Sequence, residues 1–166
     1  MSTDRPYCEV QVSITKITQN NEWMPFRWQL ESVTVIGPNA EPIPDNDEFK
    51  CWSRAKVELY LDEVDGYYLN CTANHPAWFV HYRLDEEMGD EAIPEVRMVT
   101  LSYNEAGRTM DGGELVENVP TDKLTAGWLA EFTQKHFVSE PRKRRRPASF
   151  VAPGARTSDN VGKNDT

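Results

Sequence analysis

Three histidines, His75, His81 and His136, are the residues best suited to proton transfer or metal binding. Catalysis needs a nucleophile, a base and an orienting group side by side, and a metal needs several converging ligands. His75 precedes a proline in an expected turn, and His81 follows on an expected strand. That spacing does not guarantee that the two imidazoles meet a carboxylate. The sequence therefore predicts no catalytic residue and no metal site.

Carboxylates and glycines also fail to form a recognisable site. The acidic run from Asp85 to Glu91 lacks the spaced ligands of a calcium loop and is typical of a solvated loop. Neither GxxxxGK[ST] nor GxGxxG occurs, so no glycine loop is available to hold a phosphate. We expect a protein that is not an enzyme and has no cofactor.

The cysteines and the hydropathy bear on the compartment. Cys8, Cys51 and Cys71 form no CxxC pair and are odd in number, which favours three free thiols in a reducing environment. No apolar run approaches the roughly 20 residues of a membrane helix, and the first residues lack the apolar region of a signal peptide. A cytoplasmic location without a membrane span is expected.

An aromatic segment is the first candidate for binding. Trp23, Met24 and Phe26 follow the turn signal Asn20-Asn21, where burial of large side chains is difficult to arrange. An exposed Trp beside Met and Phe is a good anchor for a protein partner. The alternative is that these side chains fold back over the end of a β barrel.

A basic block is the second candidate. Arg142, Lys143, Arg144, Arg145 and Arg146 follow a body of opposite charge. Before Pro141 there are 11 Lys+Arg and 25 Asp+Glu, and from Pro141 onward 7 and 2, within a net charge of -9. The block suits nucleic acid, an anionic membrane or an acidic protein surface. Without interleaved aromatics, specific nucleic-acid recognition is not expected, which leaves an arm for a protein partner or a solubilising tail.

Period-two alternation predicts the strands that would position these residues. It occurs around Val10–Ile14, Phe26–Val35, Ala55–Leu61, Tyr67–Cys71, Trp78–Tyr82 and Val96–Tyr103, with a short edge strand at 115–119. A β-bulge near Glu31-Ser32 is needed to keep the second strand in phase. Asp65-Gly66 reads as a hairpin turn, 37–47 as an exposed loop, and 104–113 as one helical turn.

A helix over 121–138 completes the predicted domain. Thr121 is the expected N-cap, and Leu124, Trp128 and Phe132 form an apolar stripe that should cover the open side or mouth of the sheet. The fold class is mainly β (α+β): a small antiparallel barrel or sandwich of six to seven strands, capped by one C-terminal helix. We expect a single domain over 1–140 and a basic, largely disordered tail over 141–166.

The order of these motifs resembles a bacterial family of unknown function, domain number three thousand three hundred and five. The shared segments are Trp23-Met24-Pro25-Phe26-Arg27-Trp28, Val57-Glu58-Leu59-Tyr60, Tyr68-Leu69-Asn70, Pro76-Ala77-Trp78-Phe79-Val80, the run from Val99 to Ala106, Val116 to Pro120, the helix, and Glu140-Pro141 followed by basic residues. The resemblance spans roughly Val10 to Arg146. It carries no catalytic motif and no established functional residue.

Members of that family are often encoded beside molybdenum- or tungsten-dependent formate dehydrogenase and its accessory proteins. The resemblance implies a non-enzymatic accessory role in assembly, maturation or regulation of such an enzyme, through contact with one of its subunits or a maturation factor. Some members are labelled as molybdopterin-guanine dinucleotide biosynthesis proteins, but the glycine-rich start of that nucleotidyltransferase is absent here. The alternative function is a carrier that holds a pterin or similar small ligand in the barrel interior.

Overall fold

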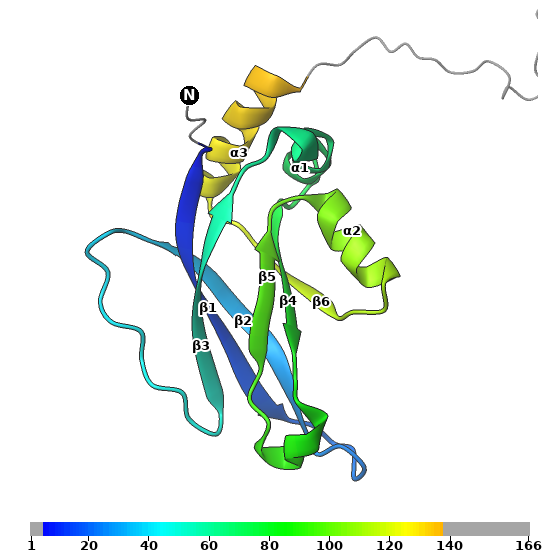
Figure 1. Ribbon diagram of the computed structural model, residues 1–166. Coiled ribbons are helices and arrows are strands. Elements are labelled where there is room, and N and C mark those ends of the chain that lie inside the picture. Colours follow the sequence, from blue (N-terminus) through cyan, green and yellow to red (C-terminus); the bar gives the residue numbers. More distant parts are fainter. Residues whose placement is uncertain (1–4, 138–166) are drawn as a thin grey trace, which may run out of the picture. The chain divides into compact units, whose positions relative to one another are not determined.

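A computed structural model describes residues 5–137 of the chain, and Figure 1 shows how the elements follow one another. Six strands form two three-stranded antiparallel sheets, with orders β2-β1-β3 and β5-β4-β6. The elements are β1 Tyr7–Thr18, β2 Phe26–Ile36, β3 Lys50–Glu58, η1 Leu61–Glu63, α1 Val64–Cys71, β4 Ala77–Arg83, η2 Glu86–Glu91, β5 Glu95–Thr100, α2 Tyr103–Asp111, β6 Val116–Pro120 and α3 Lys123–His136. The mainly β, α+β class predicted from the alternation is confirmed.

The first sheet is built around β1. Its Val10, Val12 and Ile14 are fully buried, as the alternation predicts. The predicted bulge is confirmed, because Ser13 pairs with Ser32 while Ile14 pairs with Leu30, which leaves Glu31 as the extra residue of β2.

The bulged Glu31 has its own set of partners. Its carboxylate accepts hydrogen bonds from the hydroxyls of Ser13 (3.2 Å) and Thr15 (2.8 Å) and lies 2.8 Å from the Lys50 Nζ. These contacts, the one with Lys50 above all, hold the pKa of Glu31 below its usual value. One side chain of the bulge is thus tied to the neighbouring strand β1 and, beyond it, to Lys50 of β3.

The second sheet is built around β4, which is covered on both faces. Six of its seven residues are buried, and only Arg83 is exposed. Trp78, Val80 and Tyr82 are buried together with the apolar residues of β1 and β2. On the other face, Phe79 joins Ala77 and Ala106 of α2 in a small core cluster.

Side chains, not backbone pairing, link the two sheets. β2 lies beside β6 and β3 beside β5, but no ladder joins the sheets within residues 5–137. Across the first seam, the Leu30 amide donates to Glu117 Oε1 (2.7 Å), and the Tyr82 hydroxyl donates to the Trp28 carbonyl (3.1 Å). These bonds occupy groups that a strand neighbour would use. The closed-barrel form of the prediction is therefore wrong.

The predicted hairpin at Asp65-Gly66 is also wrong, because this segment forms α1. Val64, Tyr67 and Asn70 face inward at helical spacing, whereas Leu69, one of the alternating residues, is exposed. Asn70 is buried: its amide nitrogen donates to the carbonyls of Ala77 (2.8 Å) and Leu101 (2.9 Å), and its Oδ1 accepts from the Ala77 amide (2.9 Å). These tertiary bonds hold α1 against β4 and the end of β5.

The helix α2 is longer than the single turn predicted for 104–113. Its N-cap is Ser102, whose hydroxyl accepts from the Glu105 amide (3.0 Å) and donates to Glu63 (2.6 Å). Glu63 also pairs with Arg108. α1 approaches this cap so closely that a Cβ on Gly66 would lie 2.1 Å from the Ser102 hydroxyl oxygen.

The terminal helix is present, and its predicted apolar stripe is confirmed at Phe132, but the stripe is wrong at Leu124 and the predicted cap is wrong. α3 packs against α1 (Figure 1), where Phe132 meets Tyr67 edge to face with ring centres 5.7 Å apart. The residues that α3 buries are Thr125, Leu129, Phe132 and Thr133, whereas Leu124 is 86% exposed. Asp122, not Thr121, accepts the bond from the Thr125 amide (2.7 Å). Since α1 and α2 also cover the sheets, the expectation of one capping helix is corrected to three α-helices within residues 5–137.

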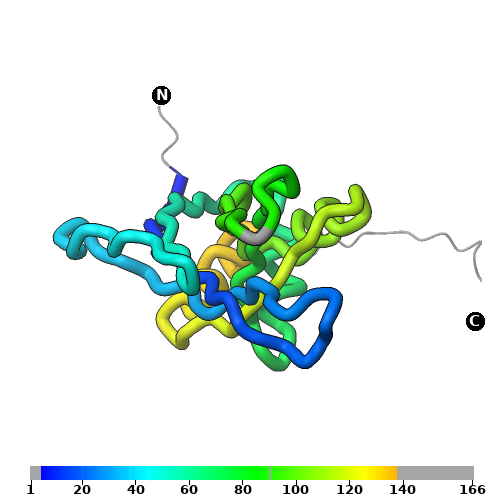
Figure 2. Tube along the Cα trace, turned by 90° about the horizontal axis from the view of Figure 1, so that it is seen from below, coloured from blue at the N-terminus to red at the C-terminus, as the bar shows by residue number. Residues whose placement is uncertain are grey.

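The predicted loop between β2 and β3 is confirmed. It projects away from the sheets in both views (Figures 1 and 2), and its residues from 41 to 49 are all exposed. The Asp47 carboxylate accepts from the amides of Phe49 and Lys50, both at 2.8 Å, and so forms the turn that leads into β3.

Candidate functional site

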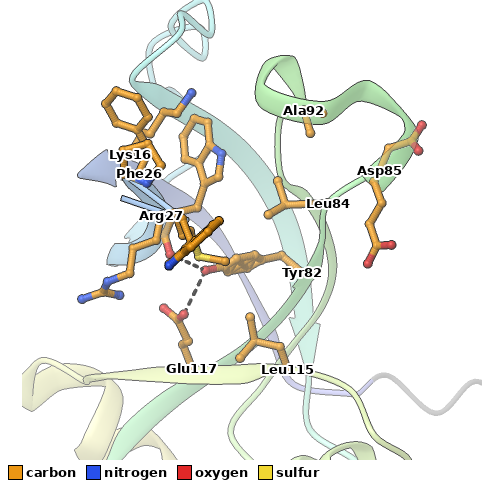
Figure 3. Close-up of a pocket in the computed structure, with 15 residues that line it drawn as sticks. Lys16, Phe26, Arg27, Tyr82, Leu84, Asp85, Ala92, Leu115 and Glu117 are labelled. Atoms are coloured by element: carbon orange, nitrogen blue, oxygen red, sulfur yellow. Dashed lines mark hydrogen bonds between the residues drawn. The ribbon is translucent and has the colours of Figure 1, made fainter. Parts of the chain in front are cut away.

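A hollow of about 580 Å³ lies where the turn between β1 and β2 approaches β4, β6 and η2. Figure 3 shows it, and we call it the aromatic hollow. Its residues are Lys16, Trp23, Met24, Pro25, Phe26, Arg27, Trp28, Tyr82, Leu84, Asp85, Glu86, Gly89, Ala92, Leu115 and Glu117. This volume is within the range of sites that bind small ligands or anchoring side chains of partners.

Side-chain hydrogen bonds hold the β1–β2 turn in place. The Asn21 carboxamide oxygen accepts from the amides of Trp23 (2.9 Å) and Met24 (3.3 Å), in the manner of an Asx turn. Gln19 donates from its backbone to the Pro25 carbonyl (2.8 Å) and from its side chain to the Met24 carbonyl (2.6 Å). The turn thus presents Trp23 in the open, with 88% of its surface exposed.

Aromatic rings and a cation line the wall that continues into β2. Lys16 Nζ lies 5.0 Å from the centre of the Phe26 ring and 5.8 Å from that of Trp28, within cation–π range. The lysine stem also covers apolar surface between these rings. This wall is therefore apolar in its body and positively charged along one margin.

Tyr82 and Glu117 form the floor of the aromatic hollow. The Tyr82 hydroxyl lies 2.9 Å from Glu117 Oε2, and its single proton is shared between this carboxylate and the Trp28 carbonyl. Figure 3 shows the side chains of Tyr82 and Glu117 meeting below Leu84. Burial, and then the bond to Glu117, raise the pKa of Tyr82, so the hydroxyl remains a donor at neutral pH. Glu117 is half-buried and has no ion-pair partner among residues 5–137.

The opposite wall combines apolar side chains with a strongly acidic margin. Leu84 and Leu115 point toward the aromatic wall, whereas the Asp85 carboxylate is turned outward (Figure 3). Asp85 caps η2 by accepting from the Glu87 amide (3.0 Å). We call the exposed carboxylates of this short helix and its cap the acidic arm: Asp85, Glu86, Glu87 and Glu91.

The structure brings the first group of predicted binding residues together. Trp23, Met24 and Phe26 all line the aromatic hollow, and all three are exposed. That they bind a partner stays a prediction. The second predicted group, Arg142, Lys143, Arg144, Arg145 and Arg146, lies outside the described residues.

Sequence reasoning missed the wall that faces this turn. Tyr82 of β4, Glu117 of β6 and Leu115, the residue before β6, lie more than 50 residues further along the chain. One signal was present for Glu117, since a lone acidic residue between Val116 and Val119 on a short strand is out of place if that strand is buried. Nothing local in the sequence could have paired it with the β1–β2 turn.

The histidines do not form a catalytic or metal-binding group. His75 is exposed in the turn before β4, and His136 stacks near Phe132 with ring centres 4.6 Å apart. His81 is buried: its Nδ1 donates to the Leu115 carbonyl (2.9 Å) and its Nε2 lies 3.5 Å from Glu114 Oε1. Over residues 5–137, no three His, Cys, Asp or Glu side chains are grouped so that they could hold a metal ion.

The three cysteines are free, as the sequence indicates. Burial, and then the charge of Asp122, raise the pKa of the Cys8 thiol to about 11. Burial also raises the pKa of Cys51. Because the thiolate is the reactive form, neither cysteine is activated as a nucleophile at neutral pH.

Comparison with known proteins identifies the family and nothing closer. Of the helices in residues 5–137, none has the length and apolar character needed to cross a membrane. No curated protein and no solved structure matches the chain. Residues 9–146 match the family described as "Protein of unknown function (DUF3305)", and the chain therefore belongs to the DUF3305 family.

Proposed function

We propose that this protein is a non-enzymatic accessory factor that docks onto a protein partner through the aromatic hollow. The observation that carries the proposal is the 88% exposure of Trp23 on a turn held by hydrogen bonds, beside Met24 and Phe26. Large apolar side chains gathered on one rigid surface are typical of protein interfaces, and Trp is the commonest energetic anchor of such interfaces.

The arrangement of polar groups supports docking over catalysis. The Tyr82 hydroxyl and the Glu117 carboxylate bond to each other and to the backbone of β2. Both ring nitrogens of His81 have protein neighbours. These groups are used in holding the two sheets together, so they support a rigid platform better than proton transfer.

The partner we propose is a component of a molybdenum- or tungsten-dependent formate dehydrogenase, or a factor that matures it. This part of the proposal rests on the family resemblance, which implies such a role in assembly, maturation or regulation. The alternative, a carrier with a pterin in the barrel interior, has less support because the two sheets do not close into a barrel.

The test is recovery of partners on the tagged full-length protein expressed in its native host. We expect a formate dehydrogenase subunit or maturation factor to be recovered with the natural chain and to be lost with Trp23→Ala/Met24→Ala. Leu124→Ala is the matched control, because Leu124 is equally exposed but lies on α3, outside the hollow.

A further variant examines the basic block. Replacement of Arg142–Arg146 by glutamine tests whether this block contributes to the same partner. Absence of any formate dehydrogenase component from the natural chain's partners would contradict the proposal. Recovery of such a component in equal amounts with the natural chain and with Trp23→Ala/Met24→Ala would also contradict it.

A further inference from the structure

We infer that the aromatic hollow selects a basic partner: a protein segment that inserts an apolar side chain into the hollow and lays Lys or Arg side chains on the acidic arm. This inference rests on the proposed docking function and specifies the chemistry of the partner. It follows from how charge is distributed around the apolar centre of the hollow.

The centre of the hollow suits an apolar anchor. Trp23, Met24 and Phe26 face Leu84 and Leu115, and all five side chains are at least 39% exposed. Such residues leave water only if another apolar group covers them, at roughly 25 cal/mol for each Å² removed from solvent. An inserted Leu, Met or Phe side chain would gain this burial from both walls at once.

Negative charge dominates the margin. Of the acidic arm, Asp85 and Glu86 line the hollow, and Glu87 and Glu91 are further exposed carboxylates of the same short helix. Glu22 is next to Trp23 in the chain. Glu117 lies on the floor. The two cations at the hollow are Lys16, whose ammonium is above the rings of Phe26 and Trp28, and Arg27.

These carboxylates are not neutralised within the described domain. None of the acidic-arm residues has an ion-pair partner among residues 5–137, whereas Glu31, Glu63 and Glu114 are paired with Lys50, Arg108 and Arg83. Without Asp4 and Glu140, the count before Pro141 leaves 11 Lys+Arg and 23 Asp+Glu in residues 5–137. The field of the whole domain therefore adds to the attraction for a basic segment.

At the margin of the hollow, the carboxylates that would attract basic side chains are separate from the apolar side chains that an anchor would bury. Figure 3 shows the Asp85 carboxylate turned outward while Leu84 points inward, so a basic side chain can contact the arm without entering the apolar centre. Exposed ion pairs contribute little individually, and their main effect is on partner choice and association rate. The apolar insertion would supply most of the affinity, and the arm would supply the selectivity.

The test measures peptide binding to the purified full-length protein by fluorescence anisotropy. The probe is a fluorescein-labelled peptide with a central Phe-Leu pair flanked by Lys and Arg, and its control has Glu and Asp in the flanks. We expect the basic probe to bind at least about tenfold more tightly than the acidic one, with a difference that shrinks as salt is raised.

Variants assign the binding to the hollow. Trp23→Ala should lower the affinity for the basic probe at least about tenfold, as expected when an anchor residue is removed. Glu86→Gln/Glu87→Gln/Glu91→Gln should lower the affinity for the basic probe about three- to tenfold and make that affinity less dependent on salt concentration. The matched control, Glu41→Gln/Asp45→Asn/Glu48→Gln, removes three exposed carboxylates from the 37–49 loop and should leave binding within about twofold.

Several results would overturn the inference. Equal binding of acidic and basic probes, no binding of either, or equal effects of the two triple variants would each do so. Self-association of the natural chain in sedimentation, abolished by Trp23→Ala, would assign the hollow to a second copy and overturn the basic partner. None of these results would affect the recovery of a formate dehydrogenase component through Trp23. The failure of this inference can therefore be distinguished from the failure of the proposed function.

Discussion

At the end of the sheets where α1 and α3 lie, the side chain of Asn70 is buried and bonds to the backbone of Ala77 in β4 and of Leu101, just after β5. At the opposite end, Trp23 is 88% exposed (Figure 1). We call these the helical end and the hollow end. Both ends are held by side-chain hydrogen bonds to backbone. The helical end uses them to bury its apolar residues, and the hollow end uses them to keep apolar residues exposed. The difference indicates that stability and recognition are located at separate ends of the domain.

The largest loss of stability is expected from Asn70→Ala at the helical end. The substitution leaves the Ala77 amide and the carbonyls of Ala77 and Leu101 without their side-chain partner. We expect the free energy of unfolding to fall by about 2–4 kcal/mol, measured by urea denaturation. Asn74→Ala, in an exposed turn, is the control and should change it by less than about 0.5 kcal/mol. Equal losses for both would show that the amide is not what holds this end.

Gly66→Ala probes the same end through packing, with a smaller expected effect. The added methyl group would collide with the Ser102 hydroxyl, and overpacking of this kind costs about 1–3 kcal/mol. Gly107→Ala makes the same change on α2, where the added Cβ would meet no atom within 4 Å apart from its chain neighbours and the backbone of its own helix. Because alanine has a higher helix propensity than glycine, this control should raise the free energy of unfolding by about 0.5–1 kcal/mol. Thermal or urea denaturation that gave both variants the same sign would contradict the close packing of α1 on the α2 cap.

At the hollow end, Trp23→Ala should have almost no effect on folding. Since Trp23 is almost fully exposed and its turn is held by Asn21, we expect the free energy of unfolding to change by less than about 0.5 kcal/mol. Calorimetry of the full-length protein measures it. A loss above about 1 kcal/mol would mean that the indole folds back over the end of the sheets, which is the alternative left open by the sequence.

Much of the sheet structure could be predicted because alternation is a local property. Val10, Val12 and Ile14 mark β1, and the break in phase at Glu31 marks the bulge. The same rule failed at Tyr67–Cys71, because a short helix there happens to carry alternating apolar residues. Asn70 carries the decisive information, yet its partners are 7 and 31 residues away, so a local pattern cannot show them.

Helices were predicted less well, for reasons that differ between them. The sequence Ser102-Tyr103-Asn104-Glu105 has the S-x-x-E spacing of a helix start, and attention to it would have placed α2 correctly. For α3, apolar character alone selected Leu124, although the helix buries the polar Thr125 and Thr133. Packing against α1 decides which face is buried, and that contact is invisible in a hydrophobicity pattern.

At the candidate site, the sequence predicted one wall and not the other. Trp23, Met24 and Phe26 stand out because three large apolar residues surround a turn. Tyr82 and Glu117 become part of the site only through the seam between the sheets, which depends on the strand order. The hollow as a binding surface is thus a property of the tertiary fold.

The seam across β2 and β6 has a consequence for how this protein behaves in a crowded solution. A bare strand edge offers its amides and carbonyls to strands of other molecules and so seeds aggregation. Here the Glu117 carboxylate accepts a hydrogen bond from the backbone amide of Leu30 in β2. The Tyr82 hydroxyl donates to the backbone carbonyl of Trp28 in the same strand. The edge of β2, which continues from the exposed β1–β2 turn, is therefore protected from pairing with strands of other molecules. The apolar surface of the aromatic hollow can then remain exposed without causing strand-to-strand aggregation.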